Sequence, residues 1–311
     1  MSSVTKPLLK MTRTYDPARD LGWLHALWLK TMGPQWSLSS HELQRTLAQS
    51  ALRLVAEQEG SPVGFCAVGF KGSGPAGLLI ILVEPASQRQ GFGSALLAEA
   101  EDTLRQLGVT EFNLGFGNDG NYFWPGVPAN HAWPFFTSCG WQETESAFDL
   151  VRSLADYSTP PWVYERLSSA GLVLRLATPE LRTRLLAFEQ ESFPAWAPFL
   201  ESAMDEGEYG NILLAQTPDG DIAGAVLLKA AVPAIWDADR NIRYGSINIL
   251  GVAPHQQGKG AGIALTARAL EILKERACSR CYIQWTGLVE WYGKLGATVW
   301  AEYCMSSKRL L

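Results

Sequence analysis

Hydrophobic and polar positions follow the same order of patterns in the two halves of this chain. Two β-rich runs, residues 52–57 and 63–68, are separated by a short turn that contains glycine. Residues 212–216 and 222–227 repeat that arrangement in the second half. Two such runs joined by a glycine-containing turn are typical of a β-hairpin, so one hairpin is predicted in each half.

A strand and a helix are predicted after each hairpin. Residues 77–83 are continuously apolar, as in a strand buried on both faces, while residues 244–252 alternate more. Pro85 and Pro254 end these strands. Apolar residues then recur at helical spacing: Leu96, Leu97, Ala100, Leu104 and Leu107 in the first half, and Leu265, Ala269, Leu270 and Leu273 in the second.

The two halves also share identical residues in one register. Residues 83–104 and 252–273 match at ten of 22 positions with a constant separation of 169. A repeat of this length indicates a tandem duplication. The sequence Ser-Thr-Pro-Pro at 158–161 is a break signal between the copies. We therefore expect an N-terminal domain over 1–155, a linker over 156–165 and a C-terminal domain over 166–311.

Composition excludes several classes of protein. The chain has 311 residues, of which 47% are hydrophobic and 18% charged, so it is neither disordered nor of low complexity. The net charge is -5 and neither half is basic, which predicts no nucleic-acid partner. The longest strongly apolar run, residues 77–83, is too short to span a membrane. Five scattered cysteines make no disulfide framework or metal site, so a cytoplasmic protein is expected.

The glycines between strand and helix indicate a phosphate site. Glycine lets the backbone approach a ligand, and the first N–H groups of the following helix have no intrahelical partner. A dinucleotide fingerprint would need a third glycine where Leu96 and Leu265 stand. A P-loop would need Ser or Thr after Lys259, where Gly260 stands. The pattern present in both copies is instead Val-x-Pro followed by Gln-x-x-Gly-x-Gly.

This pattern, complete at 88–93 and again at 257–262, resembles the GNAT superfamily of N-acetyltransferases. The arrangement is similar to that of tandem-GNAT proteins such as mycothiol synthase. The resemblance implies an α/β (α+β) fold of two tandem GNAT domains. Each is expected to have a mixed, mostly antiparallel sheet with splayed central strands and helices on both faces.

The resemblance also implies acetyl-CoA as the cofactor. In the family the splayed strand hydrogen-bonds the pantetheine arm, and N–H groups of the turn hold the pyrophosphate. Carried over position by position, the expected cofactor-binding residues are Val83, Gln88, Arg89, Gln90, Gly91, Phe92, Gly93, Ser94, Val252, Gln257, Gly258, Lys259, Gly260, Ala261, Gly262 and Ile263.

A second family motif distinguishes the two copies. Phe136 stands four residues before Gly140, and Tyr292 stands four residues before Gly296. In many family members this place holds a tyrosine that protonates the departing CoA thiolate, as a phenol can. Tyr292 is therefore the expected catalytic residue, and Phe136 cannot act in this way. The alternative for Tyr292 is a packed aromatic residue with no chemical role.

Some features leave alternatives open. The first copy has 13 more residues between its matching glycines than the second, within 115–128, and this segment forms either a substrate wall or lid, or packs between the domains. No general base is assigned: Glu84 has Ala253 as its counterpart, and Glu290 lies two residues from Tyr292. Several tryptophans fall where the family builds acceptor pockets: Trp23, Trp28, Trp36, Trp133, Trp196 and Trp236.

The sequence thus predicts an acetyl-CoA-dependent N-acetyltransferase that moves an acyl group to an amine of a small molecule or peptide. The alternative is an acyl-CoA-binding sensor or scaffold in which one or both domains lack turnover. The identity of the acceptor, the acyl-chain length and the oligomeric state are left open.

Overall fold

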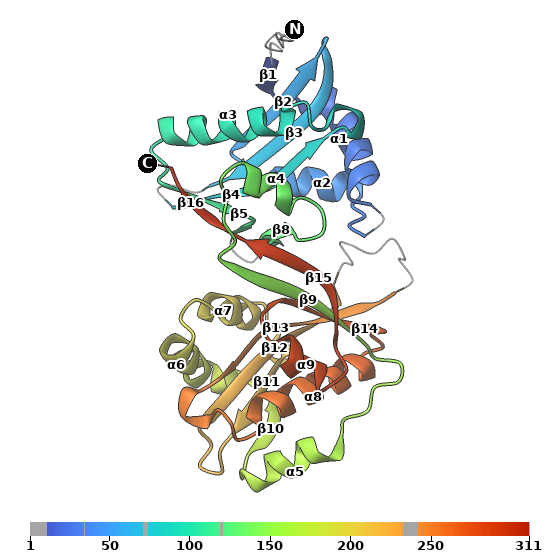
Figure 1. The fold of residues 1–311 in the computed structure, drawn as a ribbon. Coiled ribbons are helices and arrows are strands. Elements are labelled where there is room, and N and C mark those ends of the chain that lie inside the picture. The colour runs from blue at the N-terminus through green and yellow to red at the C-terminus, as the bar shows by residue number, and fades with distance from the viewer. Residues whose placement is uncertain (1–10, 34, 71–73, 119–120, 233–241, 311) are drawn as a thin grey trace. The chain divides into compact units, whose positions relative to one another are not determined.

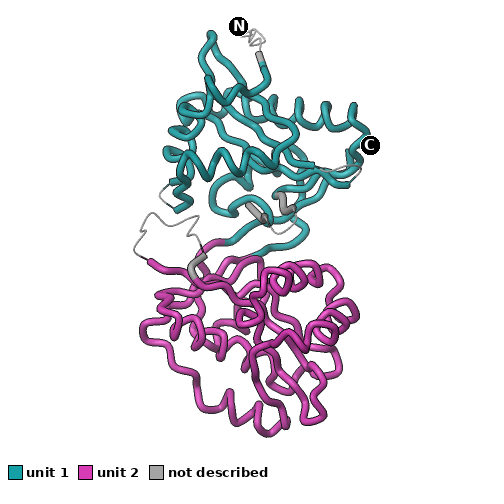
Figure 2. The backbone as a smooth tube through the Cα atoms, turned by 180° about the vertical axis from the view of Figure 1, so that it is seen from behind, with its two compact units in different colours: residues 1–147, 235–238, 302–311 teal, residues 148–234, 239–301 magenta. Residues whose placement is uncertain are grey.

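The computed structural model describes residues 11–33, 35–70, 74–118, 121–232 and 242–310. The chain divides into two compact units (Figure 2). Unit 1 comprises residues 1–147, 235–238 and 302–311, and unit 2 comprises residues 148–234 and 239–301.

Unit 1 contains a mixed sheet with the strand order β1-β2-β3-β4-β5-β16 (Figure 1). Every pair of adjacent strands in this sheet is antiparallel except β4 and β5, which are parallel. Its strands are β1 (Met11–Thr14), β2 (Leu52–Gln58), β3 (Ser61–Gly69), β4 (Ala76–Val83), β5 (Glu111–Leu114) and β16 (Ser307–Arg309), with a separate pair β6 (Phe116–Asn118) and β7 (Asn121–Trp124), and β8 (Val127–Pro128). Its helices are α1 (Pro17–Thr31), α2 (Ser40–Leu47), the short 3₁₀ turn η1 (Pro85–Ser87), α3 (Phe92–Gln106) and α4 (Trp133–Ser138).

Local sequence explains where the first two helices begin. Asp16 caps α1 by accepting a hydrogen bond from the Ala18 N–H, and Pro17 fits the first turn because its missing N–H is not needed there. At α2, Ser39 and Glu42 form a reciprocal capping box. Both helices are thus fixed at their starts by side chains that satisfy free backbone donors.

Unit 2 repeats this plan with the strand order β10-β11-β12-β13-β14-β9-β15, and β15 continues to β8. Its strands are β9 (Glu145–Ser153), β10 (Val173–Leu176), β11 (Ile212–Gln216), β12 (Ile222–Val232), β13 (Tyr244–Val252), β14 (Arg280–Thr286) and β15 (Thr298–Met305). Its helices are α5 (Pro161–Ser169), η2 (Pro179–Leu181), α6 (Arg182–Ser192), α7 (Ala197–Asp205), η3 (Tyr209–Asn211), η4 (Pro254–Gln256), α8 (Ala261–Glu275) and α9 (Val289–Gly293).

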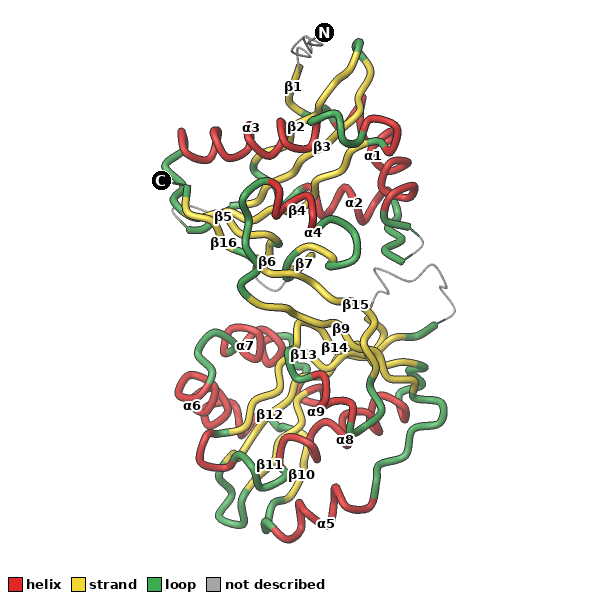
Figure 3. The backbone as a smooth tube through the Cα atoms, viewed as in Figure 1, coloured by secondary structure: helices red, strands yellow, loops and turns green. Residues whose placement is uncertain are grey.

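Helices cover both faces of the sheet of unit 2 (Figure 3). Along β12, Val226 and Leu228 pack in a core with α8 and α9. Ala225 and Leu227 face the opposite side and pack in a core with α6 and α7. This alternation follows from the two-residue period of a strand. The predicted fold class, mixed sheets with helices on both faces, is confirmed.

Two strands are exchanged between the halves of the chain. Strand β9 follows the elements of unit 1 but pairs antiparallel with β14 of unit 2. The C-terminal β16 pairs antiparallel with β5 of unit 1, with Lys308 opposite Phe112. Next to it, Leu310 is buried in the core of unit 1. The compact units therefore differ from the continuous domains 1–155 and 166–311 expected from the repeat.

The expected linker over 156–165 is anchored to unit 2. Helix α5 begins in this segment and packs against α8. Tyr164 on α5 donates to Glu271 Oε2 over 2.8 Å, and Lys274 Nζ donates to the Tyr157 carbonyl over 2.8 Å. These contacts make the segment part of the second unit.

We predict that Leu310→Ala destabilises unit 1, because it leaves a cavity in a core completed by the end of the chain. The expected loss is about 2–5 kcal/mol of unfolding free energy, measured by chemical denaturation of the full chain. Leu107→Ala is the control, since Leu107 is 58% exposed in the same unit and should change stability by less than about 0.5 kcal/mol. Equal losses in the two variants would show that the C-terminal segment does not complete this core.

Candidate functional site

The central parallel strands separate in both units. In unit 1, β4 pairs with β5 only as far as Leu78, although β4 continues to Val83. In unit 2, β13 pairs with β14 only as far as Ile247 and continues to Val252. The second half of each strand therefore presents an edge that the neighbouring parallel strand does not cover.

A β-bulge lies where each pair of strands separates. In unit 1 the register with β3 shifts so that Leu79 is the extra residue. In unit 2 the register with β12 shifts around Asn248, which stands 169 residues later. A bulge reverses which residues face each side of a sheet. Accordingly Ile247 packs with α8, while Ile249 packs on the opposite side with α6 and α7.

The turns after the two strands have the same conformation. The Gln88 side chain donates to the Val83 carbonyl over 3.2 Å, and Gln257 donates to the Val252 carbonyl over the same distance. Gly91 and Gly260, the N-caps of α3 and α8, have φ angles of 86° and 99°. Only glycine adopts such angles without strain. The two glutamines thus fix the turn, and the two glycines let it enter the helix.

The other predicted cofactor residues surround these turns. Arg89 and its counterpart Gly258 both have positive φ angles. Of the side chains, Phe92, Ala261 and Ile263 are buried, so these three positions offer a ligand only their backbone. The side chains of Gln90, Ser94 and Lys259 are exposed. Gly93 and Gly262 lie under the aromatic rings of Phe135 and Trp291, at the start of α3 and α8.

A cation not expected from the sequence lies on the turn of unit 2. Arg166 of α5 donates from Nη2 to the Gly258 carbonyl over 2.6 Å. Its aliphatic stem lies against Gly260, where a Cβ atom would meet Arg166 Cγ at 2.9 Å. Arg166 therefore adds positive charge beside the glycine turn. Its distance from the motif in sequence, 92 residues, explains why the motif did not indicate it.

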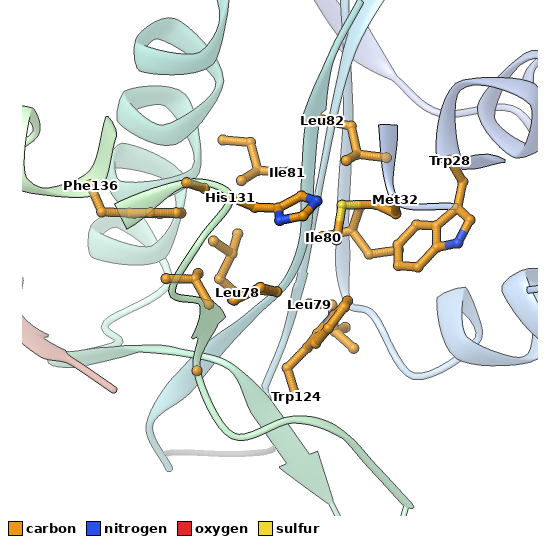
Figure 4. Close-up of a pocket in the computed structure, with 14 residues that line it drawn as sticks. Trp28, Met32, Leu78, Leu79, Ile80, Ile81, Leu82, Trp124, His131 and Phe136 are labelled. Carbon is orange, nitrogen blue, oxygen red and sulfur yellow. The ribbon is translucent and has the colours of Figure 1, made fainter. Parts of the chain in front are cut away.

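Unit 1 has a pocket of about 60 Å³ at the uncovered edge of β4 (Figure 4). Five consecutive residues, Leu78 to Leu82, line it. Trp28 and Met32 of α1 lie on one side of the strand, and Phe136 and His131 lie on the other. Apart from His131, the lining is apolar or backbone.

The segment expected to be a wall or lid contributes to this pocket. Trp124, Gly126, Val127 and Pro128 line it, which favours the wall over the alternative. Residues 119–120 of the segment and Trp236 lie outside the described residues. His131 was missed in the sequence because it is isolated there. Burial lowers the pKa of its imidazole.

Phe136 and Tyr292 occupy the same place in matching frames. The Trp141 N–H donates to the Phe136 carbonyl, as the Ala297 N–H does to the Tyr292 carbonyl. Phe136 is fully buried and Tyr292 is 6% exposed. Burial raises the pKa of the Tyr292 phenol, so this hydroxyl remains protonated and able to donate across the physiological range.

Backbone strain marks the point where β14 leaves β13. Trp285 has a φ angle of 53°, an uncommon conformation for a bulky residue. Its N–H donates to Asp149 Oδ1 over 3.0 Å, and Asp149 Oδ2 accepts from the Tyr282 hydroxyl over 2.6 Å. Asp149 is almost fully buried on β9. The exchanged strand thus holds the divergence of the sheet in unit 2.

A buried carboxyl group on α6 was also missed. Glu189 is 1% exposed. Its Oε2 atom is buried and has no hydrogen-bond partner among the described residues. Burial raises the pKa of this carboxyl to about 7. One turn later, the Phe193 ring lies where a side chain at Gly251 of β13 would stand.

Cys278 and Cys281, which are three residues apart in the sequence, are both buried and form no disulfide. Within the described ranges, no group of His, Cys, Asp and Glu side chains is arranged to hold a metal ion. No helix in those ranges is long and apolar enough to cross a membrane.

Two mixed sheets that open at a bulge, each followed by a glycine turn and a helix, define an α/β class of protein with a duplicated strand–turn–helix site. The profile of the acetyltransferase (GNAT) family matches residues 21–123 and 176–297. The chain belongs to this family.

The chain is similar to proteins that are named as acetyltransferases. The chain is 25% identical over 251 residues to the mycothiol acetyltransferase of Mycolicibacterium vanbaalenii, covering 76% of this chain and 74% of that protein. It aligns with the GCN5-related glucosamine N-acetyltransferase region of a fungal multi-domain GH3 β-N-acetylglucosaminidase at a TM-score of 0.83 and 25% identity. That alignment covers 99% of this chain but only 39% of the fungal chain.

A tandem GNAT protein from the clavulanic acid biosynthesis pathway has the same fold, with a TM-score of 0.63 and 17% identity. The alignment covers 97% of this chain and 99% of that one.

We predict that Glu189→Gln stabilises unit 2 more at high pH than at low pH. An unfolded Glu ionises near pH 4.3, whereas Glu189 in the fold ionises near 7. The ionisation of Glu189 in its buried site therefore adds almost no cost below about pH 4, costs more as pH rises, and reaches its full cost, about 3–4 kcal/mol, above pH 7. The stability of the variant relative to wild type should rise by that amount between about pH 4 and pH 8.

Chemical denaturation of the full chain at several pH values measures this difference. Glu191→Gln, which removes an exposed carboxylate from the same helix, should show no such pH-dependent gap. A constant difference between Glu189→Gln and wild type at all pH values would mean that Glu189 ionises normally in the fold.

Proposed function

We propose that this protein transfers an acetyl group from acetyl-CoA to the amine of a small molecule, and that unit 2 carries the turnover. The observation that carries the proposal is Tyr292, which occupies the place where unit 1 has Phe136 in a matching backbone frame. Membership of the acetyltransferase (GNAT) family supports acyl transfer in general.

The residues around each turn fit the shape and charge of a CoA thioester. N–H groups of the turns at 88–93 and 257–262 and of the helices that follow would bind the pyrophosphate. In unit 2, Arg166 and the exposed Lys259 add positive charge there. The uncovered edges of β4 and β13 would hydrogen-bond the extended pantetheine arm, as one strand does another.

Acyl transfer then requires attack by a neutral amine on the thioester carbonyl and protonation of the leaving thiolate. Alignment of the two reactants along the open strand edge supplies proximity. The Tyr292 hydroxyl, kept protonated by its burial, would donate its proton to the thiolate.

An amino sugar is the first acceptor class to test. The fungal region that aligns over 99% of this chain is described as a glucosamine N-acetyltransferase. The sequence prediction of a small-molecule or peptide amine includes this class. The expected cytoplasmic location and the absence of a nucleic-acid partner stay predictions.

A role in binding without turnover is the second candidate, and it applies to unit 1. Phe136 offers no proton, and the pocket beside β4 is largely apolar. Unit 1 would then hold an acyl-CoA as a structural or regulatory ligand, while unit 2 does the chemistry.

We expect two CoA sites per chain, because both turns are intact. Isothermal titration calorimetry with CoA should give a stoichiometry near two, falling to near one in Gly91→Glu and in Gly260→Glu. The added carboxylate would repel the pyrophosphate, and the side chain would strain the turn.

Matched controls are Gly108→Glu in unit 1 and Gly207→Glu in unit 2. Both glycines also have positive φ angles, 77° and 76°, but neither lies at a turn motif. These controls should keep a stoichiometry near two. A wild-type value near one, lost in only one of the two turn variants, would assign CoA binding to a single unit.

Tyr292→Phe should lower kcat by about 10²-fold or more, the scale for loss of a positioned proton donor. CoA release with glucosamine as the acceptor measures turnover, and calorimetry should show unchanged affinity for CoA. Tyr164→Phe is the control, because it removes a phenol of unit 2 that bonds Glu271 and lies outside the site. If Tyr292→Phe reacts at the wild-type rate, the hydroxyl is not the acid.

A further inference from the structure

The buried faces of α1 and α6 correspond residue by residue. The C-cap of α1 is Met32, whose N–H donates to the Trp28 carbonyl. The C-cap of α6 is Phe193, whose N–H donates to the Glu189 carbonyl. Aligning the helices by these caps gives Glu189 the position of Trp28.

The burial pattern supports the same alignment. Counting back from the caps, Asp20, Leu24, Leu27 and Trp28 correspond to Leu181, Leu185, Phe188 and Glu189. Seven of these eight residues are buried, and Phe188 is half-buried. The next helices agree, because Leu43 and Leu47 of α2 have buried counterparts in Leu200 and Met204 of α7. The helix pair before each hairpin is therefore repeated.

The corresponding residues in unit 1 both line the pocket at the strand edge. Trp28 reaches it from the α1 side of β4, and Phe136 reaches it from the α4 side (Figure 4). Their counterparts in unit 2 are Glu189 on α6 and Tyr292 on α9. Where unit 1 has two apolar aromatic side chains, unit 2 has a carboxyl and a phenol.

We propose that Glu189 is the general base of acyl transfer in unit 2, acting across the open edge of β13 from Tyr292. This inference rests on the proposed function and names the residue that prepares the acceptor. A buried carboxyl without a hydrogen-bond partner costs stability, and such groups persist where a reaction uses them.

The surroundings of Glu189 leave it unpaired. The core that α6 forms with β11, β12 and α7 contains buried apolar side chains on those three elements: Leu200, Ala203, Met204, Ile212, Leu214, Ala225 and Leu227. On the same face, β13 presents Ser246, Asn248, Ile249 and Gly251. The ionisable groups on these packed elements and on η3 are the exposed Lys229 of β12, Tyr209 of η3, Tyr244 of β13, whose hydroxyl accepts from Arg280, and Glu201 and Asp205 of α7, which pair with Arg182. Burial alone raises the pKa of Glu189.

The proton balance of the step is as follows. The Glu189 carboxylate takes one proton from the acceptor ammonium, giving a neutral amine and a carboxylic acid. The amine nitrogen bonds to the thioester carbonyl carbon, and the C–S bond then breaks. The thiolate takes the Tyr292 proton, the new amide nitrogen passes its extra proton to the Tyr292 phenolate, and the Glu189 carboxylic acid releases its proton to water. The sum is acetyl-CoA plus ammonium giving acetamide, CoA and one proton.

The first test compares pH profiles of kcat/KM with glucosamine and acetyl-CoA. Wild type should show activity that rises with pH through about 7, because the carboxylate is the active form. Glu189→Gln should lose this ascending limb and at least about 10²-fold in kcat, with unchanged CoA affinity. Glu191→Gln, on the exposed face of the same helix, should match wild type.

A second variant separates chemistry from folding. Formate should restore part of the rate to Glu189→Ala, by replacing the carboxylate, and should not restore Tyr292→Phe. An ascending limb near pH 7 that survives in Glu189→Gln, or a Glu189→Ala variant that folds, binds CoA and is not rescued, overturns the inference.

A third readout needs no acceptor. Infrared difference spectra of wild type should contain a protonated-carboxyl band that titrates near pH 7, shifts when CoA is added, and is missing in Glu189→Gln. A band that does not shift when CoA is added places Glu189 outside the site. That result overturns this inference and leaves the proposed function standing. Failure of the full chain to bind CoA at all, or wild-type rates in Tyr292→Phe, would instead overturn the proposed function.

Discussion

One extra residue in a central strand is the constraint on which each site depends. Leu79 in β4 and Asn248 in β13 are β-bulges at the same place in the two repeats. Each bulge rotates the strand beyond it, and pairing with the parallel neighbour ends one residue earlier. The uncovered edge, the pocket of unit 1 and the glycine turn all lie downstream. Regular pairing to Val83 or Val252 would close the edge.

The two repeats keep this backbone and differ in chemistry. The glutamine that holds the turn, the left-handed glycine and the cap at the end of the first helix are present in both. The side chains at two corresponding positions are not. Trp28 and Phe136 line the pocket of unit 1 with aromatic surface, whereas their counterparts in unit 2, Glu189 and Tyr292, carry titratable groups. Under the proposed function, the duplicated frame lets one copy bind and the other react.

The sequence predicted the parts of the fold that are determined by residues identical in the two repeats. The repeat at 83–104 and 252–273 located the strands, turns and helices correctly, because glycine, proline and apolar spacing act locally. It did not predict that β16 completes the sheet of unit 1, since Ser307 to Arg309 are polar and their partner lies about 200 residues away. Glu189 was missed because α6 follows a different offset from the glycine motif and its neighbours Gln190 and Glu191 resemble a solvated helix face.

Strand exchange makes the two repeats depend on each other for folding. Residues 1–147 alone would lack β16, so β5 would become an exposed edge, and Leu310 would be missing from its core. Residues from 148 onward depend on β9, which begins at Glu145, and on its Asp149 to hold Trp285. Each sheet therefore needs a strand from beyond its own repeat. Loss of either repeat would disrupt the other, so unit 1 is held in place by folding whatever chemistry it performs.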